Sequence, residues 1–215
     1  MNSISETIEN KNLTETEFAY VLGVMRDGHI TKNRLEFYSN DKTWLLNISS
    51  MLQKLYNKNP LLREIKRYGH VYWKMQIEDK HFVPKLRKIS GFKSPQSEWA
   101  TPSIIINSPK EIQDFYISGF FDAEGSVDGH LKNTWNIALY QCWNNDIECP
   151  PLADIKEILL KSGIRSNKIT VKTKNRKTPL FCLRITDKKS VKLFCEMIHS
   201  YHPAKLDKIN RILVS

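Results

Sequence analysis

The feature that most constrains the fold of this chain is an internal repeat. Three pairs of similar segments occur in the same order in the two halves, and the displacement within each pair grows slowly along the chain. The pairs are Tyr20–Gly28 with Tyr116–Gly125, Leu35–Ser39 with Ile137–Gln141, and Trp73–Val83 with Phe181–Val191. The last pair shares the pattern aromatic-x-x-x-Ile-x-Asp-Lys-x-x-Val at a displacement of 108 residues. Three matches in register indicate two homologous halves of about 100 residues each.

Hydrophobic periodicity predicts the same order of elements in both halves: a helix, two strands, a helix, two strands and a helix. In the first half, we expect helices over 16–28, 41–59 and 79–89; strands over 34–39, 62–66 and 71–77 have clear bounds, and the fourth strand is expected only from the repeated order. In the second half, we expect helices over 108–125, 151–162 and 188–201 and strands over 126–132, 135–141, 169–172 and 180–186. Thr16 and Ser108 are the expected N-caps of the two first helices. These elements predict an α+β fold with repeats over 14–90 and 108–209, joined by a linker over 91–107.

The balance of charges indicates a polyanionic partner. Lys and Arg number 33 against 23 Asp and Glu, which gives a net charge of +10. Such a surplus favours nucleic acid over an anionic membrane surface. The longest aliphatic run, 104–106, is too short to span a bilayer, and the polar N-terminus has no secretory pattern. Four cysteines without a Cys-x-x-Cys pair are typical of reduced thiols, so an intracellular protein without a membrane partner is expected.

The first helix of each half is expected to end in an acid followed by glycine, as Asp27-Gly28 and Glu124-Gly125. A carboxylate is unfavourable at a helix C-terminus, which already carries partial negative charge. If the two helices pack side by side, Asp27 and Glu124 arrive together and require a divalent cation. A metal beside a basic surface suits phosphodiester hydrolysis. The alternative is ordinary C-cap and turn chemistry, against which the duplication of the pattern counts.

The run Ile117–Gly125 resembles the nine-residue signature of the LAGLIDADG homing endonucleases, and Tyr20–Gly28 is a poorer match to it. The two copies, the αββαββα order and the chain length are similar to the single-chain members of that family. The resemblance implies pseudo-twofold units whose two four-stranded antiparallel sheets form a DNA-binding saddle. It implies a monomeric, site-specific endonuclease that uses Mg²⁺, with Mn²⁺ as a substitute. Both strands of a long double-stranded target would be cut, leaving short 3′ overhangs.

The resemblance also implies roles for individual residues. Asp27 and Glu124 would bind the metals and carry catalysis, whereas the earlier Asp122 would not bind metal. Polar or basic side chains would surround the metals and order water. By position, the candidates for this catalytic role are Ser39, Gln141, Lys93 and Lys205, and Lys205 is the better of the two lysines.

The first motif is one residue shorter than the second. Asp27 follows Gly23 by four positions, whereas Glu124 follows Gly119 by five. If the acids align, Leu22 falls opposite Gly119 and holds the helices apart. If the glycines align, Asp27 arrives one residue early and the helix end must tighten. A skewed site keeps an alternative function open: an intron RNA maturase, or a DNA-binding protein with impaired catalysis, on the same fold.

Polar side chains alternate along the predicted strands, on the face away from the helices of each half. Lys and Arg there would contact phosphates and guanine, while Asn, Gln and Tyr could read other base edges. The expected DNA-binding residues are Arg34, Tyr38, Lys66, Lys74, Gln76, Lys132, Asn136, Tyr140, Lys168, Lys172, Lys174, Arg176 and Arg184. An ordinary solvated face is the alternative for any one of them. Host intron RNA is a second partner that the maturase alternative would require.

Overall fold

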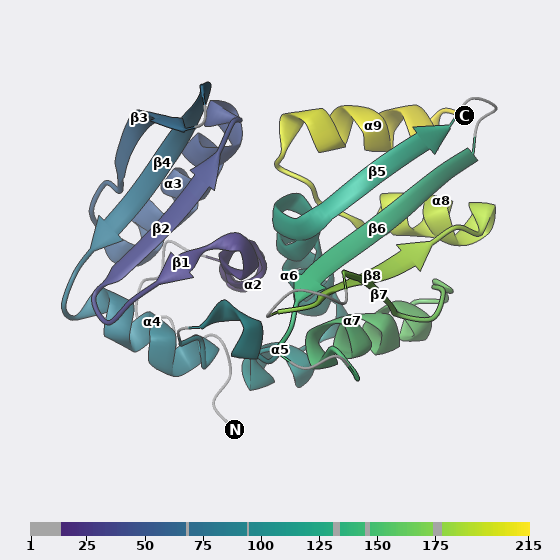
Figure 1. The fold of residues 1–215 in the computed structure, drawn as a ribbon, viewed down its shortest axis with the longest axis horizontal. Helices are drawn as coiled ribbons and strands as arrows, with labels where there is room; N and C mark the ends of the chain where they lie inside the picture. The colour runs from purple at the N-terminus through teal and green to yellow at the C-terminus, as the bar shows by residue number, and fades with distance from the viewer. Residues whose placement is uncertain (1–13, 68, 94, 131–133, 145–146, 174–177) are drawn as a thin grey trace.

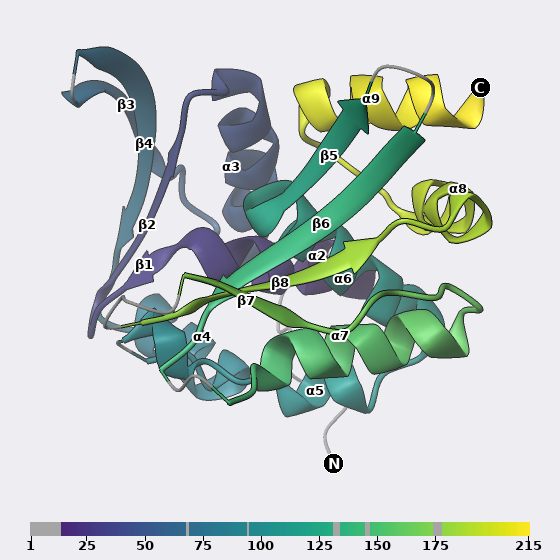
Figure 2. The ribbon, with the colours of Figure 1, turned by 45° about the vertical axis from the view of Figure 1, so that its right-hand side comes forward.

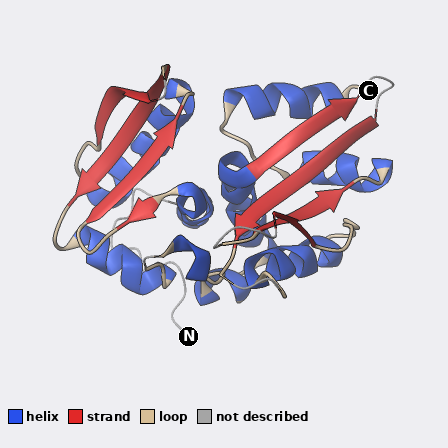
Figure 3. Ribbon diagram, viewed as in Figure 1, coloured by secondary structure: helices blue, strands red, loops and turns tan. Residues whose placement is uncertain are grey.

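A computed structural model describes residues 14–67, 69–93, 95–130, 134–144, 147–173 and 178–215. Its strands form two four-stranded antiparallel sheets, one in each half of the chain (Figure 1 and Figure 3). The first has the order β1-β2-β4-β3 and comprises β1 (His29–Ile30), β2 (Arg34–Ser39), β3 (Leu61–Arg67) and β4 (His70–Glu78). The second has the order β5-β6-β8-β7 and comprises β5 (Gly125–His130), β6 (Thr134–Cys142), β7 (Thr170–Thr173) and β8 (Leu180–Ile185). The predicted α+β fold with two such sheets is confirmed.

The two sheets share the same strand register. Leu35 lies opposite Ile77 in the first sheet, and Ile137 lies opposite Ile185 in the second. These pairs are related by displacements of 102 and 108 residues, the values by which the sequence segments repeat. All four side chains are buried. The sequence repeat therefore corresponds to a repeat of structure, residue by residue.

Helices pack on each sheet and between the two. In the first half, α3 (Lys42–Tyr56) packs on β2 and β4, and α4 (Phe82–Ser90) follows the sheet. In the second half, α7 (Pro150–Lys161) and α8 (Lys188–Met197) pack on the sheet. The helices α2 (Glu15–Val24) and α6 (Lys110–Glu124) lie side by side between the sheets (Figure 1 and Figure 2). They form the core of the contact between the two halves.

The central helices begin in ways that the sequence pattern only partly predicts. Thr14, rather than Thr16, caps α2, because its hydroxyl accepts from the Glu17 amide while the Glu17 carboxylate accepts from the Thr14 amide. This reciprocal pair satisfies two amides that would otherwise lack partners. Ser108 does not cap α6, since its hydroxyl donates to the Ile104 carbonyl. The segment between the halves contains η2 (Gln96–Glu98) and α5 (Ser103–Ile106).

The end of the second half differs from its prediction. The helix expected over 188–201 ends at Met197, and a further helix, α9 (Pro203–Leu213), follows and packs on α8 and β5. The break has a physical cause, since the backbone amides of Tyr201 and His202 donate to the Asp122 carboxylate on α6. Pro203 then stands at the first helical position of α9, where its missing N–H leaves no hydrogen bond unmade.

Candidate functional site

The two central helices cross at a pair of glycines. A Cβ atom added to Gly119 would lie 2.0 Å from the Tyr20 carbonyl oxygen, and one added to Gly23 would lie 2.1 Å from the Tyr116 carbonyl oxygen. The backbones therefore approach closely at matching points of both motifs. The structure thus aligns the glycines and not the acids, which is one of the two arrangements that the motif spacing allows.

The shorter first motif tightens the end of its helix. After Val24 the chain continues as a 3-10 turn, η1 (Met25–Asp27), whereas α6 remains α-helical through Glu124. A 3-10 turn rises more per residue than an α-helix, so fewer residues cover the same axial distance. Asp27 and Glu124 thus each end their helix, and Gly28 and Gly125 lead extended into β1 and β5.

The electrostatic shifts at the two acids show that they lie in each other's field. Burial, together with the charge of Asp27, raises the pKa of Glu124 to about 8, against the opposing charges of Arg26 and Lys205. Partial desolvation raises the pKa of Asp27 to about 6, against the opposing charge of Lys205. The Asp27 residue is nevertheless exposed at the surface. Two carboxylates so placed resist simultaneous ionisation unless a cation joins them.

Lys205 is the predicted lysine that the structure brings to the acids. It lies in the first turn of α9, and its Nζ donates to the carbonyl oxygens of Phe121 and Asp122 at 2.7 Å each. Burial lowers the pKa of Lys205 to about 8, while the charges of Asp122, Glu124 and Asp27 oppose the shift. Its ammonium group is therefore held at the end of α6, where the charges of the carboxylates act on it.

The other three catalytic candidates have different surroundings. Gln141 is buried, and its Oε1 accepts from Nε and Nη2 of Arg26 at 3.1 and 2.9 Å. Ser39 is buried at the end of β2, and its hydroxyl accepts from the Asp41 amide at 3.0 Å. Lys93 is exposed in the segment between the halves, and its carbonyl accepts from the Trp99 indole. Gln141 thus contacts Arg26, the residue that precedes Asp27. Lys93 lies on the surface.

Asp122 is fully occupied as an acceptor inside the protein. It is 1% exposed, and its carboxylate accepts from the hydroxyls of Tyr20 and Ser200 at 2.6 Å each. The Trp44 indole in turn donates to the Tyr20 hydroxyl. This network joins α2, α3, α6 and the segment before α9. Asp122 therefore fastens the two halves together, whereas Glu124, two residues later, lies at the shared site.

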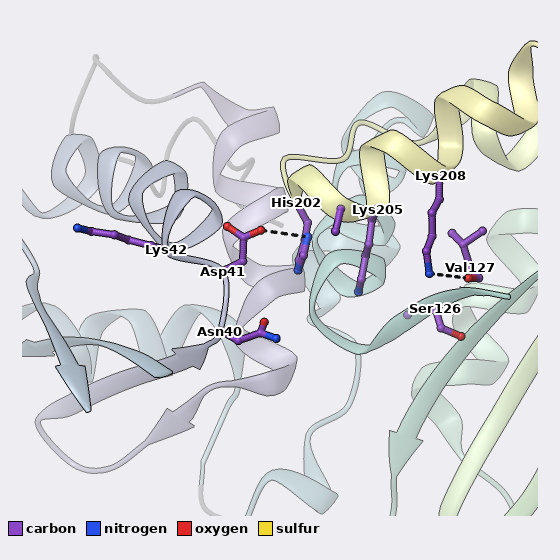
Figure 4. Close-up of a pocket in the computed structure, with 10 residues that line it drawn as sticks. Asn40, Asp41, Lys42, Ser126, Val127, His202, Lys205 and Lys208 are labelled. Carbon is purple, nitrogen blue, oxygen red and sulfur yellow. Dashed lines mark hydrogen bonds and ion pairs between the residues drawn. The ribbon is translucent and has the colours of Figure 1, made fainter. Parts of the chain in front are cut away.

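A cavity of about 540 Å³ opens between the two halves, lined in part by Lys205 and by Gly125, the residue after Glu124 (Figure 4). Its lining comprises Asn40, Asp41, Lys42, Gly125, Ser126, Val127, His202, Ala204, Lys205 and Lys208. The α3 N-terminus supplies one wall and the first turns of α9 supply another. His202 Nδ1 lies 3.9 Å from Asp41 Oδ2, and Lys208 donates to the Val127 carbonyl. Lys205 is thus accessible from a polar cavity that joins the repeats.

On the first sheet, the predicted DNA-binding residues surround an acid. Glu36 accepts from Lys74 at 2.7 Å and from the Tyr38 hydroxyl at 2.8 Å, and Arg34 lies 3.6 Å away. Gln76 donates to Glu78 instead. These residues share the predicted face, but several of their polar groups are engaged with neighbouring acids.

Lys66 was expected on that same face, and the strand register shows that it is not. Lys66 pairs with Val71, whereas Arg63 pairs with Lys74, so strand alternation puts Arg63 and not Lys66 beside Lys74. The sequence pattern predicts a strand over 62–66 but not which residues of the next strand it pairs with, so it does not determine the face on which Lys66 lies. Arg63 was missed for the same reason.

On the second sheet, Asn136, Tyr140 and Arg184 share one face. Arg184 pairs with Ala138 of β6 and lies 3.9 Å from Asp128 of β5. Lys168 and Lys172 are exposed near β7. The other expected contacts, Lys132, Lys174 and Arg176, lie outside the described residues. Within the described ranges no group of three or more His, Cys, Asp or Glu could hold a metal, and no helix is long and apolar enough to cross a membrane.

The stability of the metal-free protein is expected to fall as pH rises from about 4.5 to about 8. Glu124 keeps its proton in the folded chain up to about pH 8, whereas the unfolded chain loses it near the ordinary value of 4.5. Over that window the folded state binds more protons, so the free energy of unfolding falls with pH. Asp27 adds to the fall up to about pH 6, and Lys205 acts in the opposite sense only above about pH 8.

Thermal unfolding in EDTA between pH 5 and 8.5 measures this effect. In the Glu124→Gln variant the fall of the unfolding midpoint with pH is expected to be shallower, because the titrating group is gone. Mg²⁺ at pH 8 is expected to raise the midpoint of the unmodified protein, since a ligand of the folded state alone stabilises it. Identical pH slopes in the two proteins would contradict the raised pKa of Glu124.

Two acids and one lysine thus meet where two similar sheet-and-helix units join along a helix pair. The fold and the site define a pseudo-twofold α+β protein with a shared polar centre. Residues 111–199 match the family described as the LAGLIDADG-like domain. The second half of the chain thus carries a LAGLIDADG-like domain, and the chain as a whole is similar to a homing endonuclease and has the fold of single-chain relatives with two repeats.

Three relatives illustrate the similarity. The chain is 27% identical over 205 residues to the homing endonuclease I-ApeI of Aeropyrum pernix, covering 90% of this chain and 86% of the relative. The structure of I-DmoI in complex with DNA and Ca superposes with a TM-score of 0.60 at 16% identity, covering 86% of this chain and 89% of that one. Full-length WhiA from Thermatoga maritima has a TM-score of 0.60 at 16% identity, covering 99% of this chain and 66% of WhiA. At these identities the two structures establish a shared fold alone.

Proposed function

We propose that the protein is a site-specific DNA endonuclease that hydrolyses both strands of a long duplex in a metal-dependent reaction. The convergence of Asp27 and Glu124 at the ends of the crossed helices carries the proposal. Each acid belongs to one repeat, so the two halves of a duplex lying across the sheets would each meet one carboxylate. The similarity to I-ApeI, a homing endonuclease, supports the same activity.

The donor set suits a hard divalent cation. Two carboxylates with raised pKa values provide oxygen ligands in a polar setting, and Asp27 is exposed at the surface. Mg²⁺ is commonly held by one or two carboxylates, with phosphate oxygens and water completing its coordination. Mg²⁺, with Mn²⁺ as a substitute, would supply Lewis-acid stabilisation of the phosphate and a more acidic water. I-DmoI has been observed with DNA and Ca and with DNA and Mn.

The protein's own residues would orient the reacting groups. Asp27 and Glu124 would bind the metal, and the Lys205 ammonium would offset negative charge that develops on the phosphate. Two of its N–H bonds already donate to the end of α6, which fixes its position relative to Glu124. Ser39 and Lys93 remain candidates for ordering water or contacting the phosphate at the margin of the site.

Double-stranded DNA is the proposed partner of the two sheets, bound by a monomer. Basic and polar residues of each sheet share one face, on which Lys74 is buried against Glu36, and the net charge of +10 favours polyanions generally. On the first sheet the proposed contacts are Arg34, Tyr38, Lys74 and Gln76. On the second they are Asn136, Tyr140, Lys168, Lys172 and Arg184.

A binding protein without nuclease activity is the second candidate, acting on DNA or as an intron RNA maturase. The end of the first helix favours this candidate, because Asp27 ends a 3-10 turn whereas Glu124 ends an α-helix, so the two acids are not placed equivalently. The similar fold of WhiA shows that this architecture is not confined to proteins named as endonucleases.

Mapping of DNA ends distinguishes these candidates. The purified protein is incubated with Mg²⁺ and genomic DNA from the source organism and from related strains that lack the gene, and new ends are captured and sequenced. We expect paired breaks at one or a few sites, with short 3′ overhangs, that disappear in EDTA. Tight binding to DNA or intron RNA without any break would refute the nuclease and support the second candidate.

A further inference from the structure

One buried charge beside the site has no role in the proposed reaction. Arg26 directly precedes Asp27 and is 0% exposed. Its Nη1 donates to the carbonyl oxygens of Trp99 and Ala100 at 2.6 and 3.3 Å. Its Nε and Nη2 both donate to Gln141 on β6. The guanidinium group therefore joins the end of the first helix to the segment between the halves and to the second sheet.

Aromatic rings complete the surroundings of this group. The guanidinium carbon lies 5.5 Å from the centre of the Phe92 ring and 5.9 Å from that of Phe120 on α6. A buried cation is costly unless its donors are satisfied, and the planar fork of arginine can satisfy several acceptors in fixed directions. The position of Arg26 is therefore determined by both halves of the protein together.

Asp122 performs the corresponding task in the second repeat with the opposite charge. When Gly23 and Gly119 are aligned, Arg26 and Asp122 each follow their glycine by three residues. Arg26 donates to two carbonyls of the segment after the first repeat, and Asp122 accepts from two amides in the segment between α8 and α9. Both side chains thus hold a returning segment against their own helix.

We propose that Arg26 is a positioning residue that sets Asp27 relative to Glu124 across the shortened first motif. This role rests on the proposed nuclease function. Gln141 acts through Arg26, because its Oε1 accepts from two guanidinium nitrogens and its Nε2 donates to the Cys142 carbonyl. Its amide is therefore committed to holding the guanidinium rather than to ordering water.

Single-turnover cleavage of the mapped site tests the proposal. At saturating protein and Mg²⁺, Arg26→Met is expected to slow the rate constant by about tenfold to a hundredfold, the loss typical of a small misplacement of a reacting group. DNA affinity measured in Ca²⁺ and the final fraction of DNA cleaved should stay within about twofold of the unmodified protein. Arg26→Lys keeps the charge without the fork and should also be slow. It provides the same test should Arg26→Met fail to fold.

A double-variant comparison separates the two possible roles of Gln141. If Gln141 acts only through Arg26, adding Gln141→Met to Arg26→Met causes no further loss of rate. Losses that multiply would show that Gln141 acts on the reaction directly and would overturn that part of the proposal. Arg211→Met, at an exposed arginine in the last turn of α9, is the control and should cleave normally.

Two further outcomes would overturn the role of Arg26. One is a cleavage rate constant in both Arg26 variants that equals that of the unmodified protein. The other is a smaller final fraction of cleaved DNA at an unchanged rate constant, since that result indicates only loss of folded protein. Absence of cleavage by the unmodified protein would instead refute the nuclease itself, which keeps the two failures distinct.

Discussion

Asp27→Asn and Glu124→Gln are each expected to reduce double-strand cleavage by about a thousandfold or more. Each change keeps the shape of the side chain but removes the charge that binds a cation. Metal stabilisation of a phosphoryl transition state contributes several kcal/mol, and about 1.4 kcal/mol corresponds to a tenfold change in rate. The affinity for DNA should be nearly unchanged, because the acids contribute no attraction to phosphates.

Cleavage of a supercoiled plasmid that carries the mapped site measures this effect, since intact, nicked and linear forms are resolved together. Binding is measured in parallel with Ca²⁺. Glu111→Gln, at an exposed acid in the first turn of the same helix as Glu124, is the matched control and should retain full activity. If either active-site variant still cut both strands at a normal rate, that acid would not be a catalytic residue.

Gly119→Ala is expected to destabilise the folded protein by about 3 kcal/mol, near the upper end of the range for overpacking a core. The added methyl would lie 2.0 Å from the Tyr20 carbonyl oxygen, and backbone cannot rotate away as a side chain can. The helices must separate instead, which loosens the contacts of both halves. For a chain of this size the midpoint of thermal unfolding should fall by roughly 6–12 °C.

Thermal and urea unfolding measure the loss, and Gly23→Ala should give a similar value because its methyl would meet the Tyr116 carbonyl oxygen. Ser50→Ala, at an exposed position of α3, is the control and should change stability little. Alanine favours helix over glycine by about 1 kcal/mol, so a neutral or stabilising result at Gly119 would show that the helices do not cross there.

Much of this fold is predictable from the sequence because it is present twice. A strand pattern that is ambiguous in one copy is supported by the other, and the displacements of 102 and 108 residues reappear in the strand register. The convergence of Asp27 and Glu124 follows from the same duplication. The alignment of the glycines was one of two open arrangements, and the close approach of two backbones decided it.

What could not be predicted depends on contacts between distant segments. The break before α9 arises because Asp122 attracts amides some 80 residues away. Arg26 looks like an exposed charge at a helix end, and only the fold shows that carbonyls and an amide surround it. The position of Lys205 after the last helix predicts a place near the acids, and only the fold shows its contact with the end of α6.

The two polar fastenings have a consequence for which repeats can pair. Tyr20 of one half meets Asp122 of the other, and Arg26 of one meets Gln141 of the other. Two copies of the first repeat would bury Arg26 twice opposite Ser39, the counterpart of Gln141, whereas in two copies of the second repeat Tyr116, the counterpart of Tyr20, would lie opposite Asp122. The glycine crossing alone would accept either combination. The first repeat therefore depends on the second for the amide that accepts from Arg26, so the two repeats share a backbone arrangement but are not interchangeable at this contact.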